Sequence, residues 1–473
     1  REYDIAVAYH ADMNFTMIRN WVGQIGDKEF YEACDRHGIM VWQDFWLANP
    51  VDGPNPYYTE MFNANACDYL KRIRNHPSIG IYVGRNEGNP PAGIDDYLRG
   101  LVFREHPGLY YISNSAMGVV SGGGPYRALS PKSYFQSYGH DKFHSERGMP
   151  NVMNYESMLL TFGTDKIEPV NTSETPNPVY GLHDYTLGGG KGSSAQAASS
   201  FNDMIEKAFG RPRDAKQFAE WAQWINYDGY RAIFEGRSEH RRGMLLWMSH
   251  SAWPSMVWQT YDYYFDPNAA YFGCKKASEP LHIQWNPLRD DIEVVNYHAF
   301  DRTGLTATAS LFNQDGTLQW TRETKLDIKE DQTVACFPLE QPETLSDTYF
   351  IKLSLTDSDG KQLSDNFYWR GKEDGNYKSL LQLPKVSVCK NVTVKKTGKE
   401  WLIRAVLKNE ARTPALMLRL KVAGEKSGRM LLPVFYSDNY FSLLPGEVKE
   451  VDIRLYDADT YGEKPVLEVL GFN

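Results

Sequence analysis

The chain has 473 residues, a length that predicts about three domains rather than one. Its hydrophobic fraction of 42% is ordinary for a globular protein and allows a sizeable core. The net charge of −9 argues against a nucleic-acid partner, which would require a basic face. The sequence holds no run of about 18 apolar residues, so it predicts no membrane span and no membrane partner.

Aromatic residues are the unusual part of the composition, with 12 Trp, 30 Tyr and 22 Phe. Proteins that bind sugars stack aromatic rings on the apolar C–H faces of pyranoses, although large cores also absorb aromatic side chains. The aromatic content is therefore mild support for a carbohydrate ligand.

Five cysteines are scattered along the chain without the spacing of a metal site, at Cys34, Cys67, Cys274, Cys336 and Cys389. Their odd number and spacing argue against a disulfide framework or a zinc site, and we expect them to be buried small hydrophobic residues. We predict neither a metal nor a cofactor.

The first residues do not indicate the cellular compartment of the protein. The chain opens with Arg1 and has neither an initiator Met nor the basic and apolar regions of a signal peptide. We interpret it as a fragment or a processed chain. The sequence does not show the compartment, and we expect the full-length protein to be secreted or periplasmic.

Short strand-like runs alternate with longer amphipathic stretches over residues 1–277. The predicted strands are Phe15–Trp21, Ile39–Phe45, Ile79–Val83, Leu109–Ser113 and Met244–Trp247. The predicted helices are Asp27–His37 (opened by an Asp cap), Glu60–Arg74, Ile94–Phe103 and Ala215–Glu235. This alternation predicts βαβ units and a parallel sheet. Seven or eight such repeats without a dinucleotide glycine fingerprint favour a (β/α)8 TIM barrel over a doubly wound sheet.

From about Glu279 onward the pattern changes to short alternating strands separated by turn signals. The predicted strands are Glu293–Tyr297, Thr306–Phe312, Thr348–Leu355, Val386–Val394, Trp401–Leu407, Met417–Val422 and Val448–Leu455. These strands fit two immunoglobulin-like β-sandwiches, over 278–375 and 384–473, with the break in Gly371–Pro384. The glycine-rich stretch Gly188–Ser194 lacks the order of a phosphate-binding loop, and we predict a solvated loop there.

Two glutamates stand where a barrel enzyme carries its chemistry, at the C-terminal ends of strands. Glu87 follows the run that starts at Ile79, and Glu146 follows Phe143 and precedes Arg147. Glycoside hydrolysis requires two carboxyl groups across the scissile bond, one protonated and one ionised. The alternative reading, an ordinary surface carboxylate, is the common case for a single Glu after a strand.

A series of motifs covers nearly the whole chain in order. They are Ile-Arg19-Asn20-Trp21, Phe30 to Asp35, Val41-Trp42-Gln43-Asp44-Phe45-Trp46, Arg74 to Ser78, Val83-Gly-Arg-Asn86-Glu87, Phe143-His-Ser-Glu146-Arg-Gly, Tyr227-Asp228-Gly229, Phe234-Glu235, Ala252-Trp253-Pro254-Ser255, Tyr261 to Tyr264, Tyr271 to Gly273, Glu279 to His282 and Pro433 to Glu447. Together they resemble glycoside hydrolase family 2, in the branch of exo-β-glucosaminidases, β-mannosidases and plant endo-β-mannosidases.

The resemblance implies a retaining double displacement on an oligosaccharide or glycan. Glu146 would be the nucleophile and Glu87 the general acid/base, with carboxyl groups about 5–5.5 Å apart. Asn86 would hydrogen-bond the sugar 2-hydroxyl, although a capping residue before a helix is the alternative. Trp253 would floor the sugar site, although a Trp-Pro pair alone is more often core.

Three further residues are predicted near the sugar. Asp44 and Trp42 stand at another strand end as candidate contacts to the glycone, and Trp21 is the third candidate. A buried salt bridge to Arg19 is an equally good interpretation of Asp44. His140 and His144 with Glu146 were weighed as metal ligands, but core or supporting histidines fit better because no second acidic cluster accompanies them.

The chain also departs from the family pattern. It begins in what resembles the first barrel helix, Tyr3–Met13, so we expect the leading domains and the first barrel strand to be missing from it. Where many relatives carry Asn before the Trp-Pro pair, it has Ser249 to Ala252. A barrel without its first strand exposes two strand edges. We therefore expect either an oligomer that covers the opened edge or a distorted pocket near Asn20 and Trp21.

Two functions from different classes stay open at this point. The first is a retaining β-glycosidase with a mannose- or glucosamine-type glycone, or a galactose-type one. The second is a catalytically weak carbohydrate-binding fragment. An adhesin-like sandwich protein is a third reading, but it leaves the paired Glu87 and Glu146 unexplained.

Overall fold

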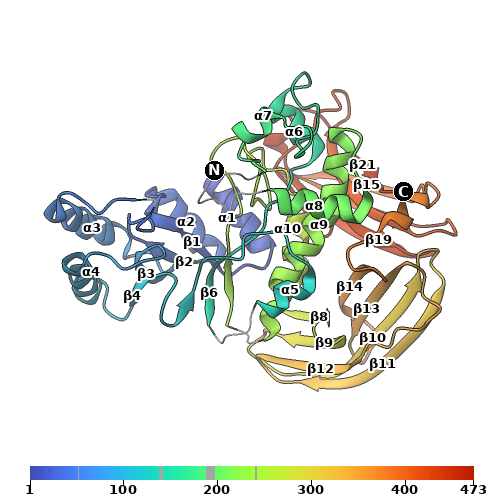
Figure 1. The fold of residues 1–473 in the computed structure, drawn as a ribbon, viewed down its shortest axis with the longest axis horizontal. Coiled ribbons are helices and arrows are strands. Elements are labelled where there is room, and N and C mark those ends of the chain that lie inside the picture. Colours follow the sequence, from blue (N-terminus) through green and yellow to red (C-terminus); the bar gives the residue numbers. More distant parts are fainter. Residues whose placement is uncertain (52, 138–141, 188–197, 240–241) are drawn as a thin grey trace. The chain divides into compact units, whose positions relative to one another are not determined.

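The computed structural model describes residues 1–473 except 52, 138–141, 188–197 and 240–241 (Figure 1). The chain divides into two compact units. The first unit combines Arg1–Pro125, His140–Arg147 and His240–Trp247, and the second combines Tyr126–Gly139, Gly148–Glu239 and Met248–Asn473. Among the described residues, no helix has both the length and the apolar character needed to cross a membrane.

The first unit alternates strands and helices. Its helices are α1 (Glu2–Asp12), α2 (Lys28–His37), α3 (Thr59–Ile73) and α4 (Ala92–Glu105), with the 3-10 turn η1 (Trp21–Gly23). Its strands are β1 (Met17–Asn20), β2 (Met40–Asp44), β3 (Ile79–Arg85), β4 (Tyr110–Asn114), β5 (Val120–Ser121), β6 (Phe143–Arg147) and β7 (Met244–Leu246). All paired strands of this unit run parallel, in the orders β1-β2-β3-β4 and β5-β6-β7.

Two apolar clusters hold the first unit together. Helices α2, α3 and α4 pack their apolar faces on one side of the four-stranded sheet, through residues such as Phe30, Tyr69 and Leu98. On the other side, Trp42 and Val83 meet Val120, Leu245 and neighbours from the three-stranded sheet. The two parallel sheets thus share an apolar interior, as the inside of a barrel does.

The second unit begins with a helical part. Its helices are α5 (Pro131–Gln136), α6 (Tyr155–Phe162), α7 (Pro178–Leu182), α8 (Ser199–Phe209), α9 (Ala215–Glu235), the 3-10 turn η3 (Gly236–Glu239) and α10 (Ala269–Ala277). Helix α9 starts where the Asp214 side chain accepts a hydrogen bond from the Gln217 N–H at 2.8 Å. It is buried on almost every face and packs closely on α10, because a Cβ at Gly273 would lie 2.5 Å from the Tyr227 carbonyl oxygen.

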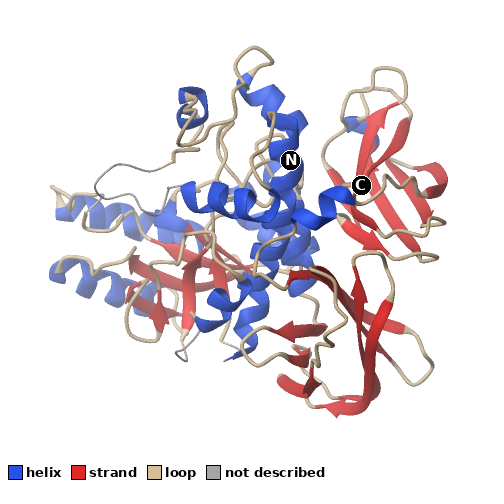
Figure 2. Cartoon of the chain, turned by 45° about the vertical axis from the view of Figure 1, so that its right-hand side comes forward, coloured by secondary structure: helices blue, strands red, loops and turns tan. Residues whose placement is uncertain are grey.

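Antiparallel strands fill the rest of the second unit (Figure 2). The first sandwich contains β8 (Leu281–Asn286), β9 (Asp291–Asn296), β10 (Arg302–Asn313), β11 (Leu318–Ile328), β12 (Gln332–Pro338), β13 (Thr348–Thr356) and β14 (Gln362–Gly371). Its two sheets have the orders β11-β10-β13-β14 and β12-β9-β8. Alternate residues of these strands, such as Ala307, Ala309 and Leu311, point into one apolar core.

The second sandwich follows the 3-10 turn η4 (Lys378–Gln382). It contains β15 (Cys389–Thr397), β16 (Glu400–Lys408), β17 (Ala415–Gly424), β18 (Val434–Tyr436), β19 (Phe441–Leu443), β20 (Val448–Tyr456), the 3-10 turn η5 (Asp457–Asp459) and β21 (Pro465–Leu470). The sheet orders are β15-β16-β20-β18 and β19-β17-β21.

The expected change of pattern near Glu279 is confirmed, because the strands are parallel before it and antiparallel after it. Closure of the parallel strands into one ring stays a prediction, since the described strands form two separate hydrogen-bonded sheets. The proposed domain limits at 277/278 and 375/384 also stay predictions. The Gly188–Ser194 stretch lies outside the described residues.

Two local predictions are wrong. Asp27 occupies the cap position of α2, but its side chain makes no capping bond and instead accepts the Tyr3 hydroxyl at 2.6 Å. Cys389 is exposed rather than buried, because it opens the edge strand β15, and its thiol donates to Glu410 at 3.0 Å.

Candidate active site

The C-terminal ends of the parallel strands of the first unit gather the predicted polar residues. Arg19 and Asn20 close β1, Asp44 closes β2, and Asn86 and Glu87 follow β3 directly. Glu146 lies within β6, in the second parallel sheet of the same unit. Since parallel strands end at a common edge, local apolar runs are enough to bring these polar ends together.

The Arg19 guanidinium joins three of the strand ends. Its Nη1 donates to Glu146 Oε1 at 2.5 Å, and its Nη2 donates to Asp44 Oδ2 at 2.8 Å and to Asn86 Oδ1 at 2.7 Å. The side chains of the ion pairs are at most 5% exposed. The predicted nucleophile and the predicted sugar-binding amide are therefore held by the same buried cation.

Asp44 is held in place within this cluster by several hydrogen bonds. It is fully buried and, besides Arg19, accepts hydrogen bonds from the Val22 N–H at 3.0 Å and the Trp42 indole at 2.7 Å. Val22 has a φ of 44°, which is unusual for a β-branched residue, so the bond to Asp44 stabilises a strained turn. The salt bridge that sequence analysis left as an alternative for Asp44 is present; its contact with a glycone stays a prediction.

The two neighbouring carboxylates stabilise the charged form of Arg19. Burial by itself would lower the pKa of this guanidinium, but the neighbouring carboxylates of Asp44 and Glu146 outweigh it and raise the pKa above its ordinary value. Arg19 is thus a permanent cation. One cation between two carboxylates leaves the cluster able to stabilise positive charge that develops on a substrate.

Glu87 is held in an uncommon backbone conformation, with a φ of 47°. Its N–H donates to the hydroxyl of the fully buried Ser115 at 2.9 Å, and the Ser115 N–H donates to the Arg85 carbonyl at 3.1 Å. Gly123 faces the Glu87 carboxyl, because a Cβ there would lie 3.8 Å from Oε1. Ser115 therefore fixes the direction in which Glu87 projects.

The predicted aromatic residues have different environments. Trp42 is buried, stacks on Phe143 and supports Asp44. Trp21 packs edge-on against Trp247, with ring centroids 5.0 Å apart, and its buried indole N–H has no hydrogen-bond partner among the described residues. Trp253 belongs to the second unit, where it is 45% exposed.

Two alternatives are now excluded. Trp253 is not a core residue, since it is exposed and stacks on His183 at 5.6 Å. Asn86 is not a helix cap, because α4 begins at Ala92 with Pro91 as its N-cap. Direct contact of Trp21, Trp42 or Trp253 with sugar stays a prediction, as does the separation of the two catalytic carboxyl groups.

The histidines weighed as metal ligands give no metal site that can be described. His144 Nδ1 lies 3.0 Å from the Ser121 hydroxyl and 3.0 Å from Arg147 Nη2. His140 lies outside the described residues. These contacts fit the supporting role that sequence analysis preferred for His144.

Ser115 and Arg85 are two residues at strand ends that are absent from the predicted site. Ser115 follows β4, a strand that was predicted, so the rule that chemistry lies at strand ends could have found it. Arg85 is the last residue of β3 and is 3% exposed. Its hydrogen-bond partners Ala48, Gly53 and Asn55 lie between β2 and α3, where no periodic pattern predicts their positions.

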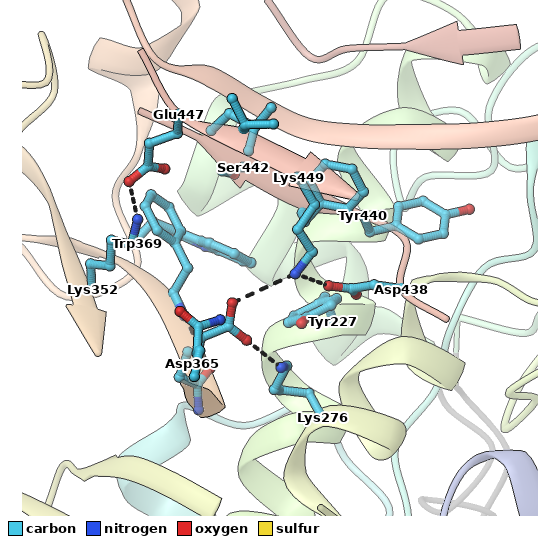
Figure 3. A pocket seen from close by; sticks show the side chains of 16 residues that line it. Tyr227, Lys276, Lys352, Asp365, Trp369, Asp438, Tyr440, Ser442, Glu447 and Lys449 are labelled. Atoms are coloured by element: carbon cyan, nitrogen blue, oxygen red, sulfur yellow. Dashed lines mark hydrogen bonds and ion pairs between the residues drawn. The ribbon is translucent and has the colours of Figure 1, made fainter. Parts of the chain in front are cut away.

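A separate polar pocket of about 200 Å³ lies in the second unit, between α9, α10 and both sandwiches (Figure 3). Lys276 contacts Asp365 at 2.6 Å, and Lys449 contacts Asp438 at 2.6 Å. Lys352 pairs with Glu447. Each lysine that lines the pocket has a carboxylate partner, so these charges join the sandwiches to the helices and do not recruit a ligand.

The chain is similar to several known glycoside hydrolases. Residues 366–473 match the family model described as the exo-β-D-glucosaminidase Ig-fold domain. A mannosylglycoprotein endo-β-mannosidase of Lilium longiflorum is 26% identical to this chain, in an alignment that covers 100% of this chain and 61% of that protein. An exo-β-D-glucosaminidase of Streptomyces avermitilis is 28% identical, in an alignment that covers 98% of this chain and 56% of that protein. The chain is similar to enzymes of glycoside hydrolase family 2.

A solved family 2 structure supports the fold. The exo-chitosanase of Amycolatopsis orientalis matches 99% of this chain with a TM-score of 0.87 and 24% identity, over 61% of its own length. An Ig-fold domain is thus present at residues 366–473. The chain spans about three-fifths of the length of these family 2 relatives.

Proposed function

We propose that the chain is the catalytic part of a retaining β-glycosidase that cleaves β-linked mannose- or glucosamine-type glycans. The observation that carries this proposal is the Arg19 guanidinium, which contacts Glu146, Asp44 and Asn86 at the strand ends of one unit. An ordinary surface carboxylate would not be buried against a shared cation.

In this mechanism the Glu146 carboxylate attacks the anomeric carbon while the bond to the leaving oxygen breaks and Glu87 protonates that oxygen. A glycosyl ester of Glu146 forms. Glu87, now ionised, takes a proton from water, whose oxygen attacks the same carbon and releases Glu146. The configuration of the sugar is retained after two inversions.

The contact to Arg19 orients the Asn86 amide. A guanidinium only donates, so the Asn86 oxygen faces it and the Nδ2 group stays available to donate to the substituent at sugar C2. A hydroxyl accepts such a bond, whereas an ammonium does not. The orientation of Asn86 therefore favours a 2-hydroxyl glycone of the mannose type over a protonated glucosamine.

Azide rescue tests the two roles on the full-length protein. With an aryl glycoside whose leaving group needs no acid, Glu87→Ala should form a glycosyl-enzyme that azide intercepts to give a β-glycosyl azide. Glu146→Ala lacks the nucleophile, so azide should attack the substrate directly and give an α-glycosyl azide. The anomeric configuration follows from proton NMR.

Labelling with a mechanism-based fluorosugar provides the second readout. We expect one added glycosyl group on Glu146 in the parent protein and none in Glu146→Gln. Binding of glycans without labelling, turnover or azide products would instead identify a carbohydrate-binding fragment, and the proposal would be withdrawn. A panel of aryl β-glycosides then identifies the glycone.

A further inference from the structure

A layer of polar side chains lies between the four-stranded sheet of the first unit and its helices. Asn20 of β1 and Gln43 of β2 are register partners, and the hydroxyl groups of Tyr31 and Tyr69 reach this pair from α2 and α3. All four residues are at most 2% exposed, and the cluster around them is apolar. Buried amides cost free energy unless they are hydrogen-bonded, so this layer differs from a helix–sheet interface that apolar residues alone would stabilise.

The hydrogen bonds of this layer form one chain that ends on the main chain of Asp44. The Tyr69 hydroxyl contacts the Tyr31 hydroxyl, which donates to Gln43 Oε1 at 2.7 Å. Asn20 Nδ2 donates to the same oxygen at 3.1 Å, and Gln43 Nε2 donates to the Asp44 carbonyl at 2.7 Å. The two donors that meet the Gln43 oxygen fix the orientation of its amide, so its nitrogen faces Asp44.

Asn20 also reaches Asp44 through a turn. Its Nδ2 donates to the Ile25 carbonyl at 2.8 Å, and the Ile25 N–H donates to its Oδ1 at 3.0 Å, so the side chain closes residues 21–25 from both sides. This turn contains Val22, whose N–H donates to Asp44 Oδ2 at 3.0 Å. Asn20 thus stabilises the strained turn that holds the Asp44 carboxylate.

The layer and the site lie on opposite faces of the same two strands, because side chains alternate along a strand. Asn20 and Gln43 lie on the face that carries the helices. Arg19 and Asp44 lie on the face toward the second parallel sheet, which supplies Glu146. The polar layer therefore acts on the site through the main chain of β1 and β2.

We propose that Gln43 is a positioning residue that holds Asp44 and, through Arg19, the predicted nucleophile Glu146. Gln43 fixes the main chain of Asp44, and Asn20 supports it by holding the turn that caps the Asp44 carboxylate. Gln43 acts from behind the sheet and does not touch the substrate. This inference rests on the proposed function.

Gln43→Glu tests this role, because a protonated carboxyl reproduces the bonds of the amide and an ionised one does not. The protonated group donates to the Asp44 carbonyl and accepts from Tyr31 and Asn20 with its other oxygen. After ionisation the donor is gone, and a negative oxygen faces the Asp44 carbonyl oxygen. The side chain keeps its length, so the two states differ only in this bond and in charge.

The surroundings of position 43 favour the protonated form at low pH. Burial and the Asp44 carboxylate, next in the chain, both disfavour ionisation, so the pKa of the introduced carboxyl should lie above the ordinary value of about 4.3. The two tyrosines stay neutral, because burial raises the pKa of their hydroxyl groups. His76, whose ring lies 5.4 Å from that of Tyr31, pairs with Asp35 at 2.6 Å.

The measurement is kcat on an activated aryl glycoside, as the ratio of variant to parent in the full-length protein. For Gln43→Glu we expect a ratio close to that of the parent at pH 5 and about tenfold lower at pH 8, because misplacement of a positioned group slows the reaction. Gln43→Met has a similar length and lacks both bonds, so its ratio should be about tenfold lower at both pH values. Melting curves at each pH show whether the variants are folded, and Gln43→Glu serves if Gln43→Met is not.

Tyr82→Phe is the matched control. Tyr82 pairs with Gln43 in the register of β2 and β3, is fully buried, and its hydroxyl contacts His106 Nδ1 at 3.0 Å. The variant loses one buried hydrogen bond beside the polar layer, but none to Asp44 or to the 21–25 turn. We expect a lower melting temperature and an unchanged kcat at both pH values.

A spectroscopic readout needs no turnover. The Trp42 indole N–H donates to Asp44 Oδ1 at 2.7 Å, so its NMR signal in protein with nitrogen-15-labelled tryptophan reports the position of this carboxylate. Loss of one signal in Trp42→Phe assigns it. We expect the signal to differ from the parent in Gln43→Met, and in Gln43→Glu at pH 8, but not in Tyr82→Phe.

The outcomes separate the two proposals. If the parent turns over, full activity of both Gln43 variants at both pH values, or an equal loss in Tyr82→Phe, would overturn the positioning role and leave the glycosidase intact. An inactive parent would count against the glycosidase alone. In that case a displaced Trp42 signal supports the role of Gln43, and an unchanged signal overturns it.

Discussion

Arg19 depends on the shape of its side chain as well as on its charge. A lysine would keep the cation but could not contact Glu146, Asp44 and Asn86 together, because an ammonium has no planar fork. For Arg19→Lys in the full-length protein we expect kcat on an activated aryl glycoside to fall about 100-fold, as for loss of a preorganised donor.

The control for Arg19→Lys is a melting curve, since both side chains are cations and the carboxylates stay compensated. A large drop in the melting temperature would show that the lost activity reflects unfolding. Unchanged kcat would show that the three contacts of Arg19 do not orient the reacting groups.

Ser115 acts on Glu87 through the backbone. Ser115→Ala leaves the Glu87 N–H without its acceptor and relaxes a φ of 47° that the hydroxyl helps to hold. We expect about tenfold loss of kcat/KM with a poor leaving group that needs the proton, and less with a dinitrophenyl group. Ser115→Thr, which keeps the hydroxyl, should restore most of the activity if the buried site admits the methyl group. Equal effects on both leaving groups would contradict this role.

At the scale of elements, helix α9 and strand β8 meet at a buried histidine. His282 Nε2 lies 3.0 Å from Glu235 Oε1, and Nδ1 lies 3.0 Å from Glu279 Oε2. Burial would lower the pKa of His282, but its bonds to the two carboxylates raise it above the ordinary value. The imidazolium therefore joins helix α9 to the first sandwich.

The raised pKa gives a pH-dependent contribution to stability. Because the folded pKa lies above the unfolded value of about 6.5, the stabilisation is complete below that value and is lost as the pH rises through the folded pKa. The difference in melting temperature between the parent protein and His282→Gln should be larger at pH 6 than at pH 9. A difference that grows toward pH 9 would contradict the assignment.

Buried elements were predictable from their apolar residues, and their polar contacts were not. The apolar run before Glu87 identifies β3, and the long apolar-rich stretch Ala215–Glu235 identifies α9, because burial favours apolar residues in both. The strand-end rule then located Glu87, Glu146 and Asp44. Strand β5 has only Val120 and Ser121, too few residues for a period to show.

The remaining site contacts depend on chain segments distant in sequence. Arg19 and Glu146 meet across 127 positions, and Arg85 binds carbonyl groups of an irregular loop. Every residue has a backbone carbonyl group, so the residue types of the sequence do not show which carbonyl groups accept hydrogen bonds from Arg85. The ion pair of Arg19 with Asp44 was predictable from the sequence because both residues lie at the ends of neighbouring predicted strands.

At the scale of the whole chain, buried ion pairs tie the last sandwich to the helices of the second unit. Arg419 of β17 contacts Glu156 of α6 at 2.8 Å and Asp266 at 3.3 Å, and the Tyr440 hydroxyl donates to Asn154 at 2.7 Å. Removal of Arg419 takes the cation from the buried Asp266 and leaves Glu156 with Lys421 alone. We expect Arg419→Met to cost about 3 kcal/mol of stability.

The measurement is thermal unfolding beside Arg404→Met, whose pair with Asp452 lies in the same sandwich but is exposed on both sides. We expect a clear fall in melting temperature for Arg419→Met and no measurable change for Arg404→Met. Equal shifts in the two variants would show that the Arg419 contacts do not stabilise the attachment.

The discontinuous make-up of the first unit has a consequence for how the protein is made on the ribosome. The segment that carries strand β7 completes this unit, yet residues 148–239 belong to the other unit and are translated first. At about 5–20 residues per second, the nascent strand that carries Glu146 waits roughly 5–20 s for its neighbour. During that interval the segment with Glu87 has already emerged, while the sheet that contains Glu146 has an open edge. Synonymous codons that slow translation between residues 148 and 239 should therefore lower the yield of active protein more than the same codons placed after residue 280.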